Sequence, residues 1–149
     1  MILGYDGNMN DCPFCKLVNE GFPAHVIYEN DEAFVMLDRQ SVAFGHSMVI
    51  PKKHTPLIYE MEDSEYIKLL RLSKDLANIF QENLNPEAVS YLAYGRDIKH
   101  VHLHLIPLEY GDEIVEPKKY MKKLSDEQLE RDANKLLSML PDLYHPLSQ

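Results

Sequence analysis

The stretch His100-Val101-His102-Leu103-His104-Leu105-Ile106-Pro107 decides the fold of this 149-residue chain. It holds three of the chain's seven histidines, each separated from the next by one aliphatic residue. Successive side chains of a β-strand point to opposite faces of its sheet. The alternation therefore predicts a strand over residues 101–107 that turns the histidines to one face and the aliphatic residues into a core. The proline should end the strand, because it cannot donate to a sheet ladder.

Three imidazoles on one face of a strand have two functional interpretations. They can bind a metal, because neutral imidazole is a common zinc ligand. They can also carry acid–base or nucleophilic chemistry, because free histidine titrates at about pH 6.5. A solvated sheet face that is rich in histidine by chance is the remaining interpretation, and strict alternation of three histidines disfavours it.

Composition narrows the class of protein. Hydrophobic content of 45% and charged content of 26% are ordinary for a soluble globular domain with a sizeable core. No window offers the ~20 apolar residues of a membrane helix, and the first residues lack a secretory signal, so we expect a cytoplasmic protein with no membrane partner. A net charge of −9 opposes a nucleic-acid backbone, but a local cluster of donors can still bind a small phosphorylated ligand.

The histidine stretch and three upstream segments resemble the signature of the histidine-triad (HIT) superfamily, His-φ-His-φ-His-φ-φ with φ apolar. The upstream segments are Cys12-Pro13-Phe14-Cys15-Lys16, Ile27-Tyr28-Glu29 and Gly45-His46-Ser47-Met48-Val49-Ile50-Pro51-Lys52-Lys53-His54. They occur in the family's order and resemble its zinc-containing, nucleotide-binding branch. The resemblance implies one HIT-like domain over residues 1–149, with a motif-bearing core at about 12–108 and a C-terminal extension at 109–149.

Local patterns predict an α+β fold with a mainly antiparallel five-stranded sheet, because the links between strands are mostly too short for helical crossovers. A long helix should cover one face of the sheet, and another helix should lie near the C-terminus. Residues 109–124 should be irregular. We expect strands at 25–29, 33–37, 48–51, 89–94 and 101–107, and helices at 13–20, 63–84 and 125–140.

The two cysteines, Cys12 and Cys15, are the only ones in the chain. A Cys-x-x-Cys motif alone fits a redox pair, half of a metal site or two small buried residues. The redox interpretation needs a strand before the motif, and nothing there predicts one. The resemblance implies that His54 and His100 complete a zinc site, and a closed four-ligand site of this kind is structural.

The resemblance also implies a nucleotide site at Asp38, Gly95, Arg96 and Asp97 together with histidines of the triad. The family's counterpart of Asp38 binds ribose hydroxyls, although an aspartate here also suits a simple turn. Relatives usually have glutamine and then a hydroxyl residue at positions 96 and 97, and that hydroxyl contacts phosphate. A carboxylate at 97 should repel phosphate unless Arg96 pairs with it or turns to the phosphate itself.

The resemblance implies that His102 attacks a nucleoside α-phosphate and forms a nucleotidyl-imidazole that water hydrolyses. Its other ring nitrogen should donate to the backbone carbonyl of His100. His104 and His46 should bind phosphate oxygens, and either can protonate the leaving group. The expected enzyme is a hydrolase or nucleotidyltransferase for a phosphoramidate, a dinucleoside polyphosphate or a similar compound. Two alternatives are a nucleotide-binding module with weak or lost catalysis, and a metalloenzyme with zinc on His100, His102 and His104.

A homodimer is the last expectation, because family relatives pair two sheets and pack their long helices across a two-fold axis. In this chain the helix over 63–84 has more apolar residues than one face needs, and the sheet has two edges that pairing would protect. The C-terminal helix could instead cover the excess within one chain. The broad apolar stripe expected on this helix comprises Ile67, Leu70, Leu72, Leu76, Ala77, Ile79 and Phe80. Its apolar residues should point to more than one side of the helix, with Ile67, Leu70 and Ala77 on one side and Leu69, Leu72 and Leu76 toward another.

Overall fold

The computed structural model describes residues 9–21, 25–111 and 124–139. The chain divides into two compact units, residues 1–114 and residues 115–149, which we describe separately. The single domain over residues 1–149 stays a prediction. The first unit contains helices α1 (Pro13–Glu20) and α2 (Asp63–Leu84), a short 3-10 turn (Ile58–Glu60), and strands β1 (Val26–Glu29), β2 (Ala33–Leu37), β3 (Ser47–Pro51), β4 (Ala88–Leu92) and β5 (Leu103–Leu108).

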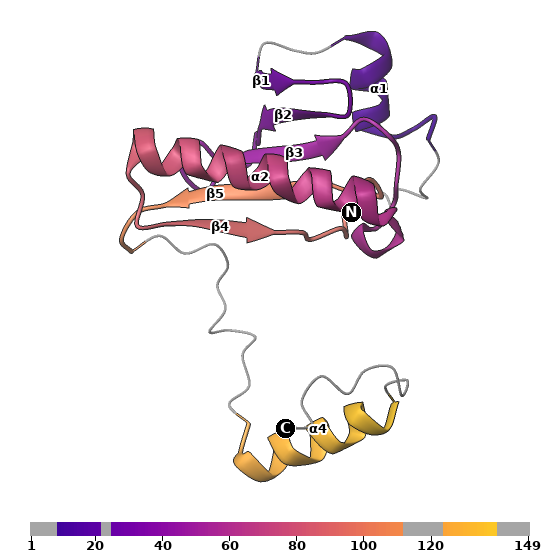
Figure 1. Cartoon of the computed structure of the whole chain (residues 1–149), viewed down its shortest axis with the longest axis vertical. Coiled ribbons are helices and arrows are strands. Elements are labelled where there is room, and N and C mark those ends of the chain that lie inside the picture. The colour runs from indigo at the N-terminus through magenta and orange to yellow at the C-terminus, as the bar shows by residue number, and fades with distance from the viewer. Residues whose placement is uncertain (1–8, 22–24, 112–123, 140–149) are drawn as a thin grey trace. The chain divides into compact units, whose positions relative to one another are not determined.

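The five strands form one antiparallel sheet in the order β1-β2-β3-β5-β4 (Figure 1). Sequential strands are neighbours except at β3, where β5 inserts between β3 and β4. Helix α2 lies across one face of this sheet. The predicted α+β fold is therefore confirmed, and β5, which carries His104, is an interior strand of the sheet.

The two faces of the sheet carry separate hydrophobic clusters. Val35 and Val49 pack with α2 on one face, whereas their neighbours along β2 and β3 pack with α1 on the other. Because His104 pairs with Met48, which belongs to the α1 cluster, His104 projects on the α1 face. Leu103 pairs with Val49 and projects on the α2 face.

Strand β5 differs from its predicted bounds at both ends. It begins at Leu103, so His100 and His102 precede it, although the predicted division of faces holds because Val101 still packs in the α2 cluster. The strand also continues through Pro107 to Leu108. Pro107 pairs with β4, but the pairing with β3 covers only Leu103–Leu105. The side of Pro107 that faces β3 therefore has no ladder partner, and the missing N–H is tolerated.

Helix α2 has the bounds that the sequence predicted, Asp63–Leu84, and it ends where Asn85 adopts a left-handed conformation before Pro86. The predicted stripe was partly wrong. The buried residues are Leu69, Ser73, Leu76 and Phe80, whereas Ile67, Leu70 and Ile79 are exposed. A serine can sit in the buried stripe because its hydroxyl donates to the Leu69 carbonyl oxygen at 2.7 Å.

The second unit contains helix α4 (Asp126–Met139), close to the predicted 125–140. Its start is a capping box, in which the Gln128 amide donates to the Ser125 hydroxyl and the Ser125 amide donates to the Gln128 side chain. Most of the predicted irregular segment, residues 112–123, lies outside the described residues. None of the helices that the structure describes has the length and apolar character needed to cross a membrane.

Candidate active site and metal centre

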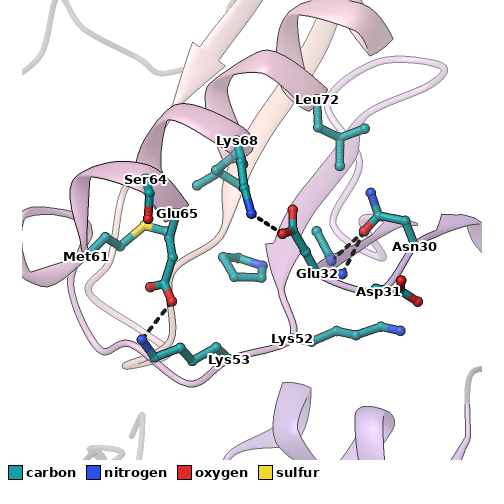
Figure 2. A pocket seen from close by; sticks show the side chains of 13 residues that line it. Asn30, Asp31, Glu32, Lys52, Lys53, Met61, Ser64, Glu65, Lys68 and Leu72 are labelled. Carbon is teal, nitrogen blue, oxygen red and sulfur yellow. Dashed lines mark hydrogen bonds and ion pairs between the residues drawn. The ribbon is translucent and has the colours of Figure 1, made fainter.

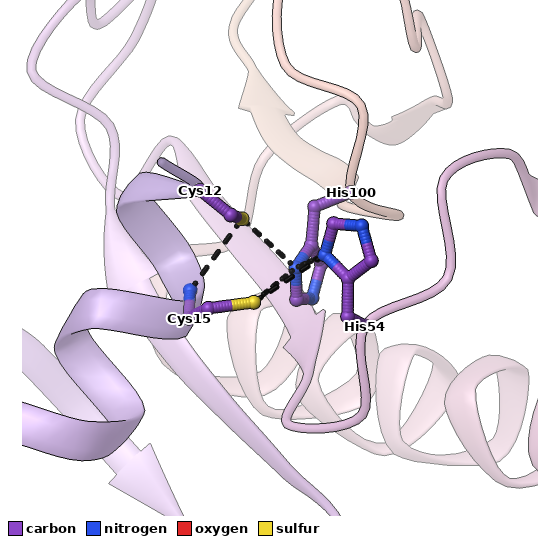
Figure 3. Close-up of side chains that lie close together, drawn as sticks. All are labelled: Cys12, Cys15, His54 and His100. Atoms are coloured by element: carbon purple, nitrogen blue, oxygen red, sulfur yellow. Dashed lines mark hydrogen bonds between the residues drawn. The ribbon is translucent and has the colours of Figure 1, made fainter. Parts of the chain in front are cut away.

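Two thiols and two imidazoles converge beside α1 (Figure 3). Cys12 Sγ lies 3.3 Å from His100 Nδ1, and Cys15 Sγ lies 3.3 Å from His54 Nδ1 and 3.6 Å from His100 Nδ1. The two Nδ1 atoms are 3.2 Å apart. A tetrahedral zinc ion has ligand separations of about 3.3 Å between nitrogens and about 3.6 Å between nitrogen and sulfur, so the four atoms have the spacing of one zinc shell.

The surroundings of these four side chains also suit a bound cation. The Nε2 proton of His100 is donated to the Pro51 carbonyl oxygen at 2.7 Å, which leaves Nδ1 as the free ligand atom. Burial lowers the pKa of His100 to about 4, so the ring is neutral at physiological pH. Burial, together with the neighbouring Cys12, raises the pKa of the Cys15 thiol to about 11. A divalent cation would supply the charge that lets both buried thiols ionise.

A cavity of about 560 Å³ lies on the α1 face of the sheet. His102 and His104 line it, and Asp38 and Asp97 line it as well. The remaining walls come from α1, from the residue before β1, from β2 and the loop after it, from β3, and from the segment before His100. They comprise Pro13, Phe14, Leu17, His25, Met36, Leu37, Arg39, Gln40, Met48, Tyr94 and Ile98. A site with apolar walls and a few polar groups suits a small organic ligand, and its volume lies within the usual range for such ligands.

The backbone fixes the orientation of the His102 ring. His102 Nδ1 lies 2.7 Å from the backbone carbonyl oxygen of His100, so Nδ1 carries the proton and donates it. Nε2 of the neutral ring then has a free lone pair. This is the hydrogen bond expected for a nucleophilic His102.

A second hydrogen-bonded group contains His46, His104 and Asp38. The backbone amide of Val42 donates to His46 Nδ1 at 3.1 Å, so the proton of neutral His46 lies on Nε2. His46 Nε2 lies 2.9 Å from His104 Nδ1 and donates to it. The proton of neutral His104 therefore lies on Nε2. Asp38 Oδ2 lies 3.3 Å from His104 Nδ1 and 3.5 Å from His46 Nε2, where it would stabilise a positive charge on either ring.

Burial keeps both of these histidines neutral. It lowers the pKa of His104 to about 4, helped by the neighbouring His102 and opposed by Asp38. It also lowers the pKa of His46, again opposed by Asp38. His104 lines the cavity whereas His46 does not line it and is only 5% exposed, so His104 is the member of this pair that can touch a ligand.

A short loop brings His46 to this position. It contains Gly45, whose φ is +84° and whose missing side chain leaves room for Leu84 and Pro107. A Cβ atom there would lie 3.3 Å from a carbon of each. The loop therefore needs a glycine immediately before His46.

The residues predicted to bind nucleotide separate into two groups. Asp38 and Asp97 line the cavity, and Asp38 also forms the turn that the sequence allowed, because its Oδ1 accepts the Gln40 amide at 2.9 Å. Arg96 instead lies over the Tyr94 ring, 5.9 Å from its centroid. The described residues include no ion pair between Arg96 and Asp97. Gly95 lines a smaller hollow that shares His102 with the cavity.

The three histidines of the triad do not gather around one point. The described chain holds two groups of potential metal ligands. One is the thiol cluster, which comprises Cys12, Cys15, His54 and His100, and the other comprises Asp38, His46 and His104. His102 belongs to neither group. The second group is a poor metal site, because the Val42 amide occupies His46 Nδ1 and keeps the proton on Nε2. This geometry disfavours the metalloenzyme with zinc on His100, His102 and His104.

Several residues that line the cavity are not marked by any distinctive pattern in the sequence. Phe14 was visible only as the residue between the two cysteines of the motif, and it contacts the His100 and His102 rings. Arg39 and Gln40 were visible only as the neighbours of Asp38. His25 carried no signal beyond being a histidine at a predicted strand start.

Another hollow, of about 350 Å³, lies between α2, the turn before β2, the start of β2 and the end of β3 (Figure 2). Lysines line it, but glutamates neutralise them. Lys53 pairs with Glu65 at 2.7 Å, and Lys68 pairs with Glu32. Because the charges cancel pairwise, this hollow offers a phosphate no excess of positive charge, and the histidine-lined cavity remains the candidate site.

The sequence is similar to that of known proteins. The model of the HIT domain family matches residues 19–111. An adenylylsulfatase, HINT3 of Arabidopsis thaliana, is 31% identical over 69% of this chain and 55% of its own length. An adenosine 5'-monophosphoramidase, HNT1 of Candida albicans, is 30% identical over 64% of this chain and 69% of its own.

Solved structures show the same fold. A Streptococcus mutans UA159 protein superposes with a TM-score of 0.70 and 27% identity, covering 90% of both chains. A Zn-bound histidine triad family protein from Mycobacterium smegmatis gives a TM-score of 0.65 and 23% identity, covering 89% of this chain and all of its own. The family model matches well over half of the sequence, and the chain belongs to the HIT domain family.

Proposed function

We propose that the protein is a nucleotide hydrolase or nucleotidyltransferase that forms a covalent nucleotidyl intermediate on His102. One observation carries the proposal. His102 lines the cavity, and its Nδ1 donates a proton to the His100 carbonyl oxygen at 2.7 Å, so the lone pair of the neutral ring lies on Nε2. The relatives that act on adenosine derivatives support a nucleotide as the substrate.

In the proposed reaction, His102 Nε2 attacks the α-phosphorus of a bound nucleoside phosphate derivative. A P–N bond forms, and the bond from phosphorus to the leaving group breaks with its electron pair. The anionic substrate and Asp38, which lies 3.3 Å from His104 Nδ1, favour a protonated His104 in the complex, and this ring donates its Nε2 proton to the leaving group and becomes neutral. His46 holds the other side of the His104 ring at 2.9 Å and is a positioning residue. Water then attacks phosphorus and gives a proton to His104 Nε2, the P–N bond breaks with its electron pair returning to His102 Nε2, and a nucleoside monophosphate leaves.

A structural zinc ion is the proposed cofactor, held by Cys12, Cys15, His54 and His100. The spacing of the four ligand atoms and the hydrogen bond from His100 Nε2 to Pro51 support it. The Zn-bound relative from Mycobacterium smegmatis is consistent with this choice of metal. With four protein ligands the ion would have no open position for substrate, so its contribution would be rigidity.

Asp97 favours an amine as the leaving group. The cavity is lined by the carboxylates of Asp38 and Asp97. Arg96 does not neutralise the charge of Asp97, because its guanidinium lies over the Tyr94 ring. A departing sulfate or phosphate would be repelled by these carboxylates, whereas a departing amine carries no negative charge and would not be repelled. We therefore propose nucleoside phosphoramidates as better substrates than dinucleoside polyphosphates or adenylyl sulfate.

A nucleotide-binding module with weak catalysis is the second candidate, and the position of Asp97 supports it as well. A carboxylate beside the cavity would slow transfer if it repelled the α-phosphate. Such a protein would bind nucleoside monophosphates but would not accumulate a nucleotidylated form. The cytoplasmic location stays a prediction.

The homodimer is also a proposal. Tyr66, Ile67, Leu70 and Ile79 are exposed on α2 although they are large and apolar, and β4 is an edge strand. A two-fold contact through these elements would cover both features.

The direct test of the function is His102→Ala. The variant should lose turnover of an adenosine phosphoramidate by at least about a thousandfold but should keep AMP binding within about threefold, because the ring projects into the cavity while the neighbouring Val101 packs in the core. A variant that keeps more than a few per cent of wild-type turnover would rule out His102 as the nucleophile.

A further inference from the structure

Phe14 joins the thiol cluster to the His102 ring. It lies between Cys12 and Cys15, and its ring is only 4% exposed. The ring centroid lies 5.5 Å from that of His100 at 82° and 5.4 Å from that of His102 at 59°. Both arrangements are edge-on or tilted ring contacts, which are attractive and restrict the position of each ring.

Helix α1, which carries Phe14, depends on the thiol cluster for its position. It has only eight residues, far fewer than a helix needs for stability in isolation. Cys12 is its N-cap residue, and its sulfur accepts the Cys15 amide at 3.5 Å. Both cysteines are buried, so a metal bound to them would attach the first turn of α1 to the histidines that flank the sheet.

His100 provides a second connection. Its ring belongs to the thiol cluster, whereas its backbone carbonyl oxygen accepts the Nδ1 proton of His102. The nucleophile is thus held on two sides, by the His100 backbone and by the Phe14 ring, and both supports contain or adjoin ligands of the metal site.

We propose that Phe14 is a positioning residue through which occupancy of the metal site keeps His102 in one tautomer with Nε2 toward the cavity. This inference rests on the proposed function of His102. It extends that function, because it makes the Cys-x-x-Cys helix part of the apparatus that orients the nucleophile. Metal loss would then release α1 and the Phe14 ring, and the His102 ring would sample other orientations.

The test uses Phe14→Leu in the full-length, zinc-loaded protein, with Phe80→Leu as the matched control. Phe80 is similarly buried, at 8% exposure, but packs on the opposite face of the sheet with α2. Each variant is measured for bound zinc, for AMP binding, for kcat and KM, and for the ¹⁵N shifts of the His102 ring, which report its tautomer at fixed pH.

Phe14→Leu should keep one zinc, lower kcat about tenfold or more, and convert the single Nδ1-protonated signal of His102 into a mixture. Phe80→Leu should leave kcat within about twofold and the His102 signal unchanged. Wild-type protein stripped of metal by a chelator should show the same mixture as Phe14→Leu. If Phe14→Leu retains both the wild-type kcat and a single tautomer, Phe14 has no positioning role.

A metal-free wild type that stays folded with one His102 tautomer would likewise overturn the coupling. If chelation unfolds the protein, the Phe14→Leu result decides the matter alone. The NMR readout separates this proposal from the proposed function. An enzyme that forms no adduct on His102 would disprove the nucleophile, yet the tautomer would still report whether Phe14 and the metal orient the ring.

Discussion

His104 should make the protein markedly less stable as the pH falls from 6.5 to 4. In the unfolded chain this ring protonates near pH 6.5, whereas burial in the folded protein lowers its pKa to about 4. Between these values the unfolded state binds one more proton than the folded state, so the free energy of unfolding decreases with falling pH. Each pH unit contributes about 1.4 kcal/mol, and the full shift contributes about 3 kcal/mol.

The measurement is urea denaturation of the zinc-loaded protein at pH 7 and pH 5. At pH 5 the His104 contribution should be about 2 kcal/mol, because the pH then lies about 1.5 units below the unfolded pKa. The side chain is only 14% exposed, so solvent screening should remove little of this effect. Other groups also titrate in this range, and comparison with His104→Gln isolates the contribution of His104.

The variant should lose about 2 kcal/mol less than wild type between the two pH values. Its stability at pH 7 need not match that of wild type, because only the difference between pH values is used. Equal losses in the two proteins would show that His104 is not held neutral by the fold.

Three further predictions concern the metal, the leaving group and the oligomer. Cys12→Ser/Cys15→Ser should contain no zinc by elemental analysis and should lose several kcal/mol of stability, whereas a folded wild type purified without metal would refute the zinc site. Asp97→Ser should raise kcat/KM for adenylyl sulfate about fivefold relative to a phosphoramidate, from on the order of 1 kcal/mol of repulsion, and Asp75→Asn on α2 should leave that ratio unchanged. Sedimentation equilibrium at micromolar concentration should give twice the 17.3 kDa chain mass, and a monomer mass would reject the dimer.

Much of the fold could be predicted from local patterns. The bounds of α2 follow from the acidic start at Asp63 and from Asn85-Pro86, which cannot continue a helix, and both ends agree with the structure. The alternation around His102 also predicted correctly that Val101 and Leu103 enter the core. These predictions succeed because each depends on residues that are close in the sequence.

The predictions of the buried face of α2 and of the end of β5 were wrong, because contacts between segments distant in the sequence determine both. Which side of α2 faces the sheet depends on packing against strands that are distant in the sequence. The buried position of Ser73 was not predicted, because a buried serine is tolerated only when its hydroxyl is hydrogen-bonded, here to the Leu69 carbonyl oxygen. Pro107 lies within β5 because β3 ends its pairing before reaching it.

The same limit applies to the site. The cysteines and histidines could be recognised by type and spacing, but the contact between Phe14 and His102 joins residues 88 positions apart. The Val42 amide, which sets the tautomer of His46, is a backbone group that every non-proline residue possesses. No pattern of side chains could have identified it.

In the proposed reaction, His102 Nε2 becomes covalently bonded to the α-phosphorus of the substrate. Intact-mass spectrometry after rapid mixing of the zinc-loaded protein with an adenosine phosphoramidate and acid quenching tests it directly. Wild type should gain the mass of one adenylyl group, the adduct should map to His102, and His102→Ala should show none. A wild type that turns over substrate without any adduct at any mixing time, or an adduct that persists in His102→Ala, would contradict the account.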